Sequence, residues 1–168
     1  MVPAFLLALA AVTGADTMRE ASIEGFASEH AMLASAFDAA LQKAVASAAT
    51  RNDRAGLVLF LRVELLPHAA AEERVLYPAV DSVLGTRGYA TATMVLDHKA
   101  ILRLTDELAA LAAGANADAF NRKALALGAV LQNHFAKEEE FILPILRERL
   151  KDRDLRALFA RMRTEATL

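Results

Sequence analysis

The chain has no cysteine among its 168 residues, and this absence excludes several kinds of site. Without thiols there can be no disulfide, no thiolate metal site, no iron–sulfur cluster and no covalently attached c-type haem. Nitrogen and oxygen atoms must therefore supply the ligands for any metal. Aromatic residues are also scarce, at 6%, and most of the 55% hydrophobic content is alanine and leucine, which favours closely packed helices.

An excess of basic residues is missing as well. The chain has 19 lysines and arginines against 21 aspartates and glutamates, so its net charge is −2. Binding to nucleic acid needs a surface of clustered positive charge. We therefore expect no DNA or RNA partner.

The sequence has no long hydrophobic run. The apolar opening, residues 1–16, lacks the basic region that begins a secretory signal, and it is too short to span a bilayer. We expect this opening to form an extra N-terminal helix or docking segment, with a cleaved signal peptide as the alternative. The protein is expected to be cytoplasmic and to have no membrane association.

Apolar residues recur at three- and four-residue steps in four segments, which is the pattern of amphipathic helices. These segments cover about 17–47, 52–83, 91–113 and 118–144, and a shorter one covers about 152–163. No alternating pattern of β-strands competes with them. Because the connections are short, the sequence predicts an all-α, up-down-up-down four-helix bundle over 17–150, with a C-terminal helix or tail over 151–168.

Several residues are expected to set the ends and bends of these helices. Asn52 or Asp53 can cap the second helix, and Thr91 or Thr93 can cap the third. Proline removes a helical hydrogen bond, so Pro67 is expected to bend the second helix. Two further prolines are expected to end or kink the second and fourth helices: Pro78 and Pro144.

The chain has four histidines, one in each long predicted helix: His30, His68, His98 and His134. The second and the fourth begin the same phrase, because residues 68–78 and 134–144 match at His, Glu, Glu, an apolar residue and Pro. The first two histidines are 38 residues apart and the last two are 36 apart. The chain therefore reads as two copies of one helical hairpin, related by a pseudo-twofold axis.

The spacing predicts that the four imidazoles lie at similar heights in the bundle. At a rise of about 1.5 Å per residue, the distances from the connecting loops bring them within about two helical turns of one another. Residues four apart share a helix face, so Glu72 points where His68 points, and Glu138 points where His134 points. Two carboxylates from opposite helices at a common height can bridge two metal ions.

Six residues are thus the predicted metal ligands: His30, His68, Glu72, His98, His134 and Glu138. This donor set suits a pair of borderline ions, iron first, with manganese and zinc as alternatives. Each ion takes two histidines and shares both glutamates, which leaves positions open for water or another small ligand. The alternative is a metal-free bundle, since a single buried histidine is more often a hydrogen-bonded core residue than a ligand.

Residues near the predicted ligands have less certain assignments. Glu73 and Glu139 point about 100° away from their neighbours and are expected to place charge beside the site, although Glu139 can exchange roles with Glu138. Glu64 lies four residues before the second histidine and is a candidate extra ligand. Tyr77 is expected to pack in the core, with reach toward the site as the alternative.

These motifs resemble those of the hemerythrin-like family, specifically the HHE cation-binding domain. The resemblance runs from residue 29 to residue 144 and includes both His-x-x-x-Glu-Glu phrases and Asp97-His98. It implies a four-helix bundle that holds a non-haem di-iron centre, bridged by oxo or hydroxo. The implied roles are oxygen binding, peroxide or nitric oxide chemistry, and iron or oxygen sensing.

The chain departs from the oxygen-carrying members of that family at Leu102, where they have a second histidine on the third helix. Carriers also use a carboxylate five residues after the last histidine, whereas this chain offers Glu138 at four and Glu139 at five. We expect one iron to have fewer protein ligands, and the centre to bind or react with H2O2, NO or O2, with catalase-like or NO-handling activity as the enzymatic form. The alternative is an iron or oxygen sensor, or an oxygen carrier, without catalytic turnover.

Overall fold

The computed structural model describes residues 23–167, and these residues form helices and short connections with no strand. The four long helical stretches and the short one are α2 (Ile23–Val45); α3 (Arg51–Phe60) continuing through α4 (Leu66–Ala71) to α5 (Tyr77–Leu84); α6 (Ala92–Ala112); α7 (Ala117–Lys137) continuing to α8 (Leu143–Arg149); and α9 (Asp152–Ala166). The all-α prediction is confirmed. The predicted N-terminal segment, 1–16, lies outside the described residues.

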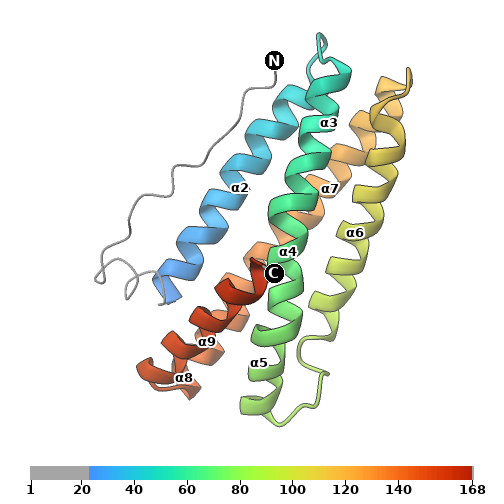
Figure 1. Cartoon of the computed structure of the whole chain (residues 1–168). Helices are drawn as coiled ribbons and strands as arrows, with labels where there is room; N and C mark the ends of the chain where they lie inside the picture. The colour runs from blue at the N-terminus through green and yellow to red at the C-terminus, as the bar shows by residue number, and fades with distance from the viewer. Residues whose placement is uncertain (1–22, 168) are drawn as a thin grey trace, which may run out of the picture.

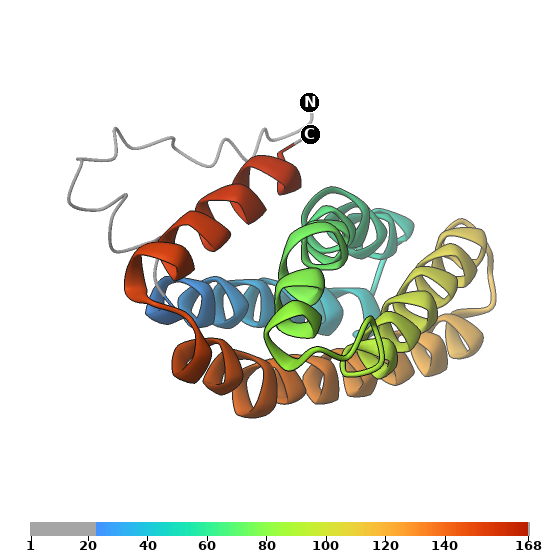
Figure 2. The same ribbon diagram turned by 90° about the horizontal axis from the view of Figure 1, so that it is seen from below.

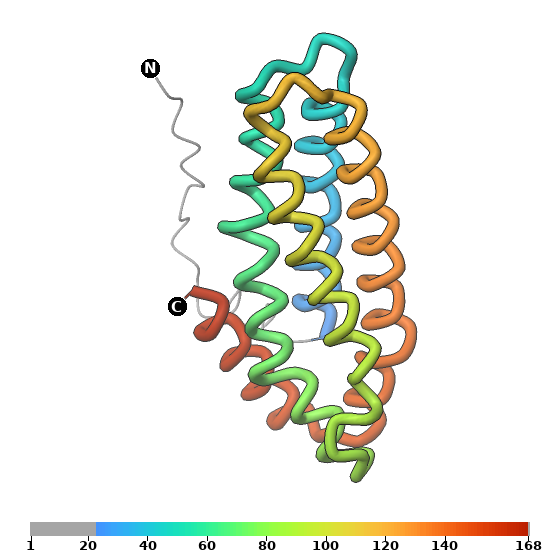
Figure 3. The backbone as a smooth tube through the Cα atoms, turned by 90° about the vertical axis from the view of Figure 1, so that its right-hand side faces the viewer, coloured from blue at the N-terminus to red at the C-terminus, as the bar shows by residue number. Residues whose placement is uncertain are grey.

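The long helices alternate in direction and form a four-helix bundle (Figures 1 and 3). Each of α2, α3, α6 and α7 packs against two of the others, so the four enclose one core. Seen from below, α9 turns back beside α2 and lies across the second helical stretch (Figure 2), where it contacts α4. Among residues 23–167, no helix is both long and apolar enough to cross a membrane.

The residues that begin the helices differ partly from the predicted ones. Thr50, rather than Asn52 or Asp53, caps α3, and Asp53 completes a reciprocal capping box with it. Thr91 precedes α6 as predicted, but its hydroxyl makes no cap. Instead, that hydroxyl donates to Asp81 across the α5–α6 connection, at 2.5 Å.

Three five-residue π-helical turns interrupt the second and fourth stretches: η1 (Leu61–Leu65), η2 (Glu72–Leu76) and η3 (Glu138–Ile142). The backbone N–H that follows each turn donates to the carbonyl five residues earlier. Each turn is followed, two residues after its end, by a proline: Pro67, Pro78 and Pro144. The predicted local disturbance at these prolines is therefore a widened turn. The helices do not end there, since they continue to Leu84 and Arg149.

The buried apolar residues form two clusters, one toward each end of the bundle. The first includes Phe37, Leu57 and Phe120, and the second includes Phe26, Leu76 and Phe159 of α9. Two leucines of α6 and α7 are exposed rather than buried in these clusters: Leu96 at 62% and Leu125 at 57%. The predicted metal ligands lie where the two clusters meet.

Candidate metal centre

Nine polar or charged side chains are buried in the described part of the chain, and six of them are the predicted ligands: His30, His68, Glu72, His98, His134 and Glu138. The two glutamates are fully buried, and each histidine is at most 5% exposed. The histidines come from α2, α4, α6 and α7, one from each long stretch. Burying this many ionisable groups is costly unless they bind one another or a cation, so the cluster needs a specific explanation.

Glu72 lies at the centre of the cluster and faces histidines on both sides. Its Oε1 is 2.8 Å from Nε2 of His68 and 3.4 Å from Nε2 of His30. Its Oε2 is 3.3 Å from Nε2 of His98 and 3.9 Å from Nε2 of His134. One carboxylate therefore presents one oxygen to each pair of imidazoles.

Glu138 also faces both sides, but through a single oxygen. Its Oε2 is 3.5 Å from Nε2 of His30 and 3.5 Å from Nε2 of His134. Its Oε1 accepts a hydrogen bond of 2.8 Å from the hydroxyl of Tyr77. The two glutamates, which occupy equivalent positions in the repeated phrase, thus have different surroundings.

The outer nitrogen of each imidazole faces a carboxylate from a neighbouring helix, in a pattern that follows the internal repeat. In the first pair, Nδ1 of His68 lies 3.4 Å from Glu29, and in the second pair, Nδ1 of His134 lies 3.4 Å from Asp97. Both carboxylates come from the residue directly before the histidine of the preceding long helix. The repeat therefore duplicates the supports of the site as well as its inner residues.

The other two histidines take their outer partners from the second glutamate of each phrase. Nδ1 of His98 is 2.9 Å from Glu73, and Nδ1 of His30 is 3.4 Å from Glu139. Both glutamates are about half exposed, at 42% and 45%. Their expected place beside the site is thus observed, and Glu138 rather than Glu139 is the buried residue.

Tyr77 packs in the core as expected, and its hydroxyl also reaches the site, which was the alternative. Its ring is 2% exposed and stacks on His98, with the centroids 5.4 Å apart. Its hydroxyl lies 3.1 Å from Nε2 of His98 as well as bonding to Glu138. A sequence signal for this role exists, because the second phrase has Leu143 at the equivalent position and only Tyr77 adds a polar atom there.

The π turn η2 accounts for the direction of Tyr77. In a π-helix the residue five positions later bonds back to the first, and the backbone of Tyr77 bonds to that of Glu72 in this way. The phenol is therefore brought to the face of the helix that carries the glutamate. The turn η1 has the opposite consequence for Glu64, which is exposed and does not reach the site. The prediction of Glu64 as an extra ligand is wrong, because the wide turn ends the four-residue register before His68.

The charges of the cluster are strongly linked. Burial alone lowers the pKa of His68, but Glu72 and Glu29 outweigh it and hold that pKa well above its usual range. Burial alone raises the pKa of Glu72, but His68 and the hydrogen bonds of its other imidazole neighbours hold it well below the usual range. Burial and the charge of Glu72 raise the pKa of Glu138. The residues thus require positive charge among them, from protons or from metal ions.

Several inner atoms are free to bind a metal ion. Three of them are buried without a hydrogen bond: Nε2 of His68, Oε2 of Glu72 and Oε2 of Glu138. Nε2 of His98 and Nε2 of His134 lie only 3.0 Å apart, while Glu73 and Asp97 face the outer nitrogens, where a proton is expected when the inner nitrogens bind a metal. A shared proton, as in a hydrogen bond, or a metal ion can lie between the two inner nitrogens.

Ligand atoms gather in two groups that share one residue. His30, His68 and Glu72 form one, Glu72, His98 and His134 form the other, and within each group the ligand atoms lie within 4.8 Å of one another. The His and Glu cluster is therefore able to hold a metal.

The comparison with protein families gives one result. The sequence profile of the hemerythrin HHE cation-binding domain matches residues 21–146 and, separately, residues 89–167. The two matches begin 68 residues apart, at 21 and 89, the displacement that also separates His30 from His98. No curated protein matches the chain. No solved structure matches it either.

Proposed function

The chain belongs to the hemerythrin HHE cation-binding domain family, and on that premise we propose that it is a non-haem di-iron protein that binds or reacts with the small oxidants H2O2, NO or O2. Six side chains hold the two irons in this proposal: His30, His68, Glu72, His98, His134 and Glu138. Iron suits a set of imidazole and carboxylate donors, and the absence of thiolates in the chain disfavours softer ions.

The observation that carries the proposal is the position of Glu72. Its two oxygens face two different imidazole pairs, one at His68 and the other at His98, at 2.8 and 3.3 Å. A single metal ion does not require that the two oxygens of one carboxylate face different imidazole pairs. Two ions joined by a carboxylate do require it, because each ion binds one oxygen.

The protein's own residues would set the conditions for chemistry at the centre. When bound, iron supplies a redox-active Lewis acid with positions for a small ligand. Asp97 and Glu29 orient two imidazoles through Nδ1, which keeps Nε2 available toward the centre. Tyr77 donates its hydroxyl proton to Glu138, and the same hydroxyl oxygen lies 3.1 Å from Nε2 of His98. The apolar clusters on both sides exclude bulk water.

Reaction is favoured over reversible oxygen carriage by the surroundings of Leu102. This residue, which replaces a histidine of the carriers, is 48% exposed and borders a groove on the outer face of α6 together with Lys99 and Arg103. It adds no donor to the centre. One ion therefore has fewer protein ligands and more positions for an exogenous molecule.

Metal analysis of the purified protein, combined with an absorption spectrum, tests the proposal. We expect about two irons per chain and the near-ultraviolet bands of an oxo-bridged ferric pair. Oxygen evolution from H2O2, or a spectral change on addition of NO, supports reaction. A stable and reversible O2 adduct without turnover supports the carrier or sensor alternative. A chain that takes up no iron, or takes up as much after His68→Ala and His134→Ala, contradicts the proposal.

A further inference from the structure

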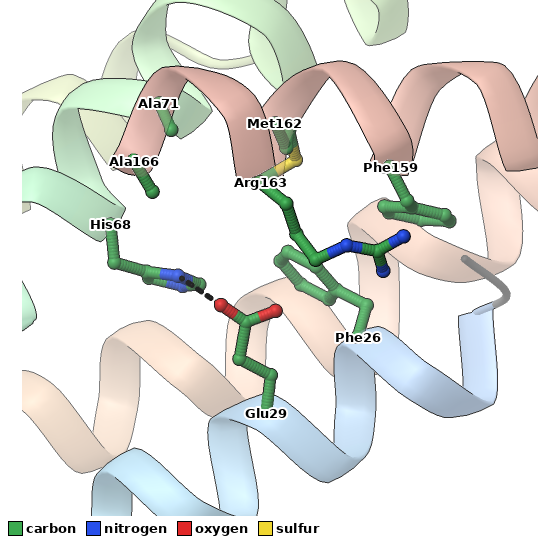
Figure 4. A pocket seen from close by; sticks show the side chains of 8 residues that line it. All are labelled: Phe26, Glu29, His68, Ala71, Phe159, Met162, Arg163 and Ala166. Carbon is green, nitrogen blue, oxygen red and sulfur yellow. Dashed lines mark ion pairs between the residues drawn. The ribbon is translucent and has the colours of Figure 1, made fainter. Parts of the chain in front are cut away.

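A small pocket lies where α2, α4 and α9 meet, directly beside the centre (Figure 4). Its walls come from Phe26 of α2, His68 and Ala71 of α4, and three residues on the inner face of α9: Phe159, Met162 and Ala166. Glu29 also borders it, and its carboxylate pairs with His68 there. The pocket thus lies between the last helix and His68, which is a predicted metal ligand.

The inner end of the pocket is the imidazole of His68. Nδ1 of that ring pairs with Glu29 at the pocket, whereas Nε2 faces Glu72 in the centre at 2.8 Å. Phe26 stacks on the same imidazole, with the ring centroids 5.7 Å apart, and also contacts His30 at 4.2 Å. A molecule in this pocket is therefore separated from the His30–His68 group by side chains alone, with no intervening helix.

The other side of the centre is covered differently. There Tyr77 stacks on His98 and its hydroxyl occupies the space next to Nε2 of that histidine, at 3.1 Å. Phe135 borders both pairs, since its ring stacks on His30 at 4.7 Å and lies 5.9 Å from His134, so Tyr77 is what distinguishes the His98 side. The two histidine pairs therefore differ in what an incoming molecule meets.

The size and the walls of the pocket define what it can admit. Its free space, about 10 Å³, holds about one molecule of the size of water. Most of the wall is hydrocarbon, aromatic ring or thioether, and the two charged side chains that border it, Glu29 and Arg163, have opposite signs, so the lining favours neither anions nor cations. A small uncharged molecule of no more than two heavy atoms fits these conditions better than an ion or an organic substrate.

The outer wall is the last turn of α9, which carries Arg163 and Ala166. Terminal helical turns lack part of their hydrogen bonding and open at low cost. In this turn Glu165 pairs with Arg74 of η2 at 3.2 Å, with both groups partly exposed, and exposed pairs contribute little stability. The buried apolar residues of the helix all precede this turn: Leu155, Leu158, Phe159 and Met162.

We propose that this pocket is the access route by which small uncharged molecules of the class of NO, O2 and H2O2 reach the His30–His68 side of the centre, with the last turn of α9 as its gate. The inference rests on the proposed function, because it takes the centre as the destination. It goes further by assigning the route, the side that receives the ligand and the charge of the ligand.

A plug in the mouth of the pocket tests the route. Ala166→Phe fills the gap beside Ala71, whereas Ala160→Phe places the same side chain on the exposed face of α9. In stopped-flow mixing of the iron(II) protein with NO, we expect the binding rate of Ala166→Phe to fall at least tenfold and that of Ala160→Phe to match the unmodified protein. Iron content and the amount of NO bound at equilibrium stay the same. Equal rates in the two variants overturn the route.

A second measurement tests the pocket without relying on iron. Dissolved O2 is paramagnetic and speeds the nuclear relaxation of methyl groups that it can reach. Met162 and Met94 are both buried, at 4% and 2%, but only Met162 lines the pocket. In protein free of iron we expect O2 to act more strongly on the methyl of Met162, and Ala166→Phe to remove the difference. Equal effects on the two methionines overturn the route, whereas a chain that binds no iron but shows this difference overturns only the proposed function.

Discussion

Tyr77 donates a hydrogen bond of 2.8 Å to Glu138, and so joins the π turn of the second helical stretch to that of the fourth. The equivalent residue in the second repeat, Leu143, has no hydroxyl, so Glu72 receives no such bond. Burial and the nearby carboxylates raise the pKa of Tyr77, and its phenol therefore stays a donor. The two halves of the centre differ chemically although the backbone repeats.

Removing this hydroxyl should cost stability. Tyr77→Phe keeps the buried ring but leaves Glu138 without its donor, so we expect the free energy of unfolding to fall by about 1–3 kcal/mol. Urea denaturation of both proteins in the same metal state measures the difference. Tyr89→Phe removes the same atom from a residue that is 86% exposed and should change little. Equal losses in the two variants contradict the role of the bond.

The two glutamates on either side of His68 offer a matched test of the ligand set. Glu72 lies four residues after this histidine and is buried in the centre, whereas Glu64 lies four residues before it and is exposed. We expect Glu72→Gln to lose metal from both histidine pairs, because both face this carboxylate. Glu64→Gln should keep the full content. Metal analysis after gel filtration decides, and equal metal contents argue against Glu72 as the bridge.

The carboxylates behind the histidines should tune metal affinity. Asp97 faces the outer nitrogen of His134 and is itself held by Lys137. Asp97→Asn weakens the orientation of the imidazole, and we expect affinity for metal to fall about tenfold or more. Competition with a chelator measures the change. Asp106→Asn, on the outer surface of α6 where the carboxylate is 64% exposed, is the control and should have no effect.

Asp81 gives a prediction for stability against pH that is independent of the centre. Its carboxylate accepts hydrogen bonds from Thr86, Thr91 and the backbone of Ala90, and so fastens the α5–α6 connection. Burial alone raises the pKa of Asp81, but these donors outweigh it and lower the pKa below its usual value. The stabilisation is therefore complete above the unfolded-state pKa of about 4 and is lost as the pH falls through the lower, folded-state pKa.

We expect Asp81→Asn to lower the free energy of unfolding by about 1–3 kcal/mol at pH 7, because an amide forms weaker bonds with the same donors. The difference from the unmodified protein should shrink below pH 4, where the carboxylate itself becomes protonated. Urea denaturation at pH 7 and pH 3 measures both values. If Asp81→Asn lowers the free energy of unfolding by the same amount at pH 7 and pH 3, the loss comes from the changed packing of the side chain and not from the loss of its charge.

The sequence predicted the bundle and the gathering of the six buried donors because both depend on regular spacing. Helical rise places His98 and His134 at one height, and the four-residue step places Glu138 beside His134. Both rules hold wherever the helix is regular. The C-terminal helix was also predicted, but its contact with the His68 side was not, since an amphipathic pattern does not say which surface covers it.

The sequence was less informative where the helix is not regular. The four-residue register changes across η1, where Glu64 is exposed, and across η2, where Tyr77 reaches the site as well as the core. Each π turn is followed by a proline, and Pro67 was interpreted only as a bend. Glu73 and Glu139 were expected beside the site, but Glu29 and Asp97 were not predicted as partners of His68 and His134, because these contacts join different helices.

Two glycines, one inside the second helical stretch and one at its end, should respond in opposite ways to substitution by alanine. Gly56 lies in α3 on the exposed surface, and an added methyl group meets nothing within 4 Å. Alanine has the higher helix propensity, so we expect Gly56→Ala to raise the free energy of unfolding by about 0.5–1 kcal/mol. Gly85 ends α5 with a φ of 69°, in the left-handed region. Gly85→Ala should instead destabilise by about 1 kcal/mol, since a side chain disfavours that conformation. Thermal and urea denaturation of the two variants measure both signs, and stabilisation by Gly85→Ala contradicts the left-handed cap.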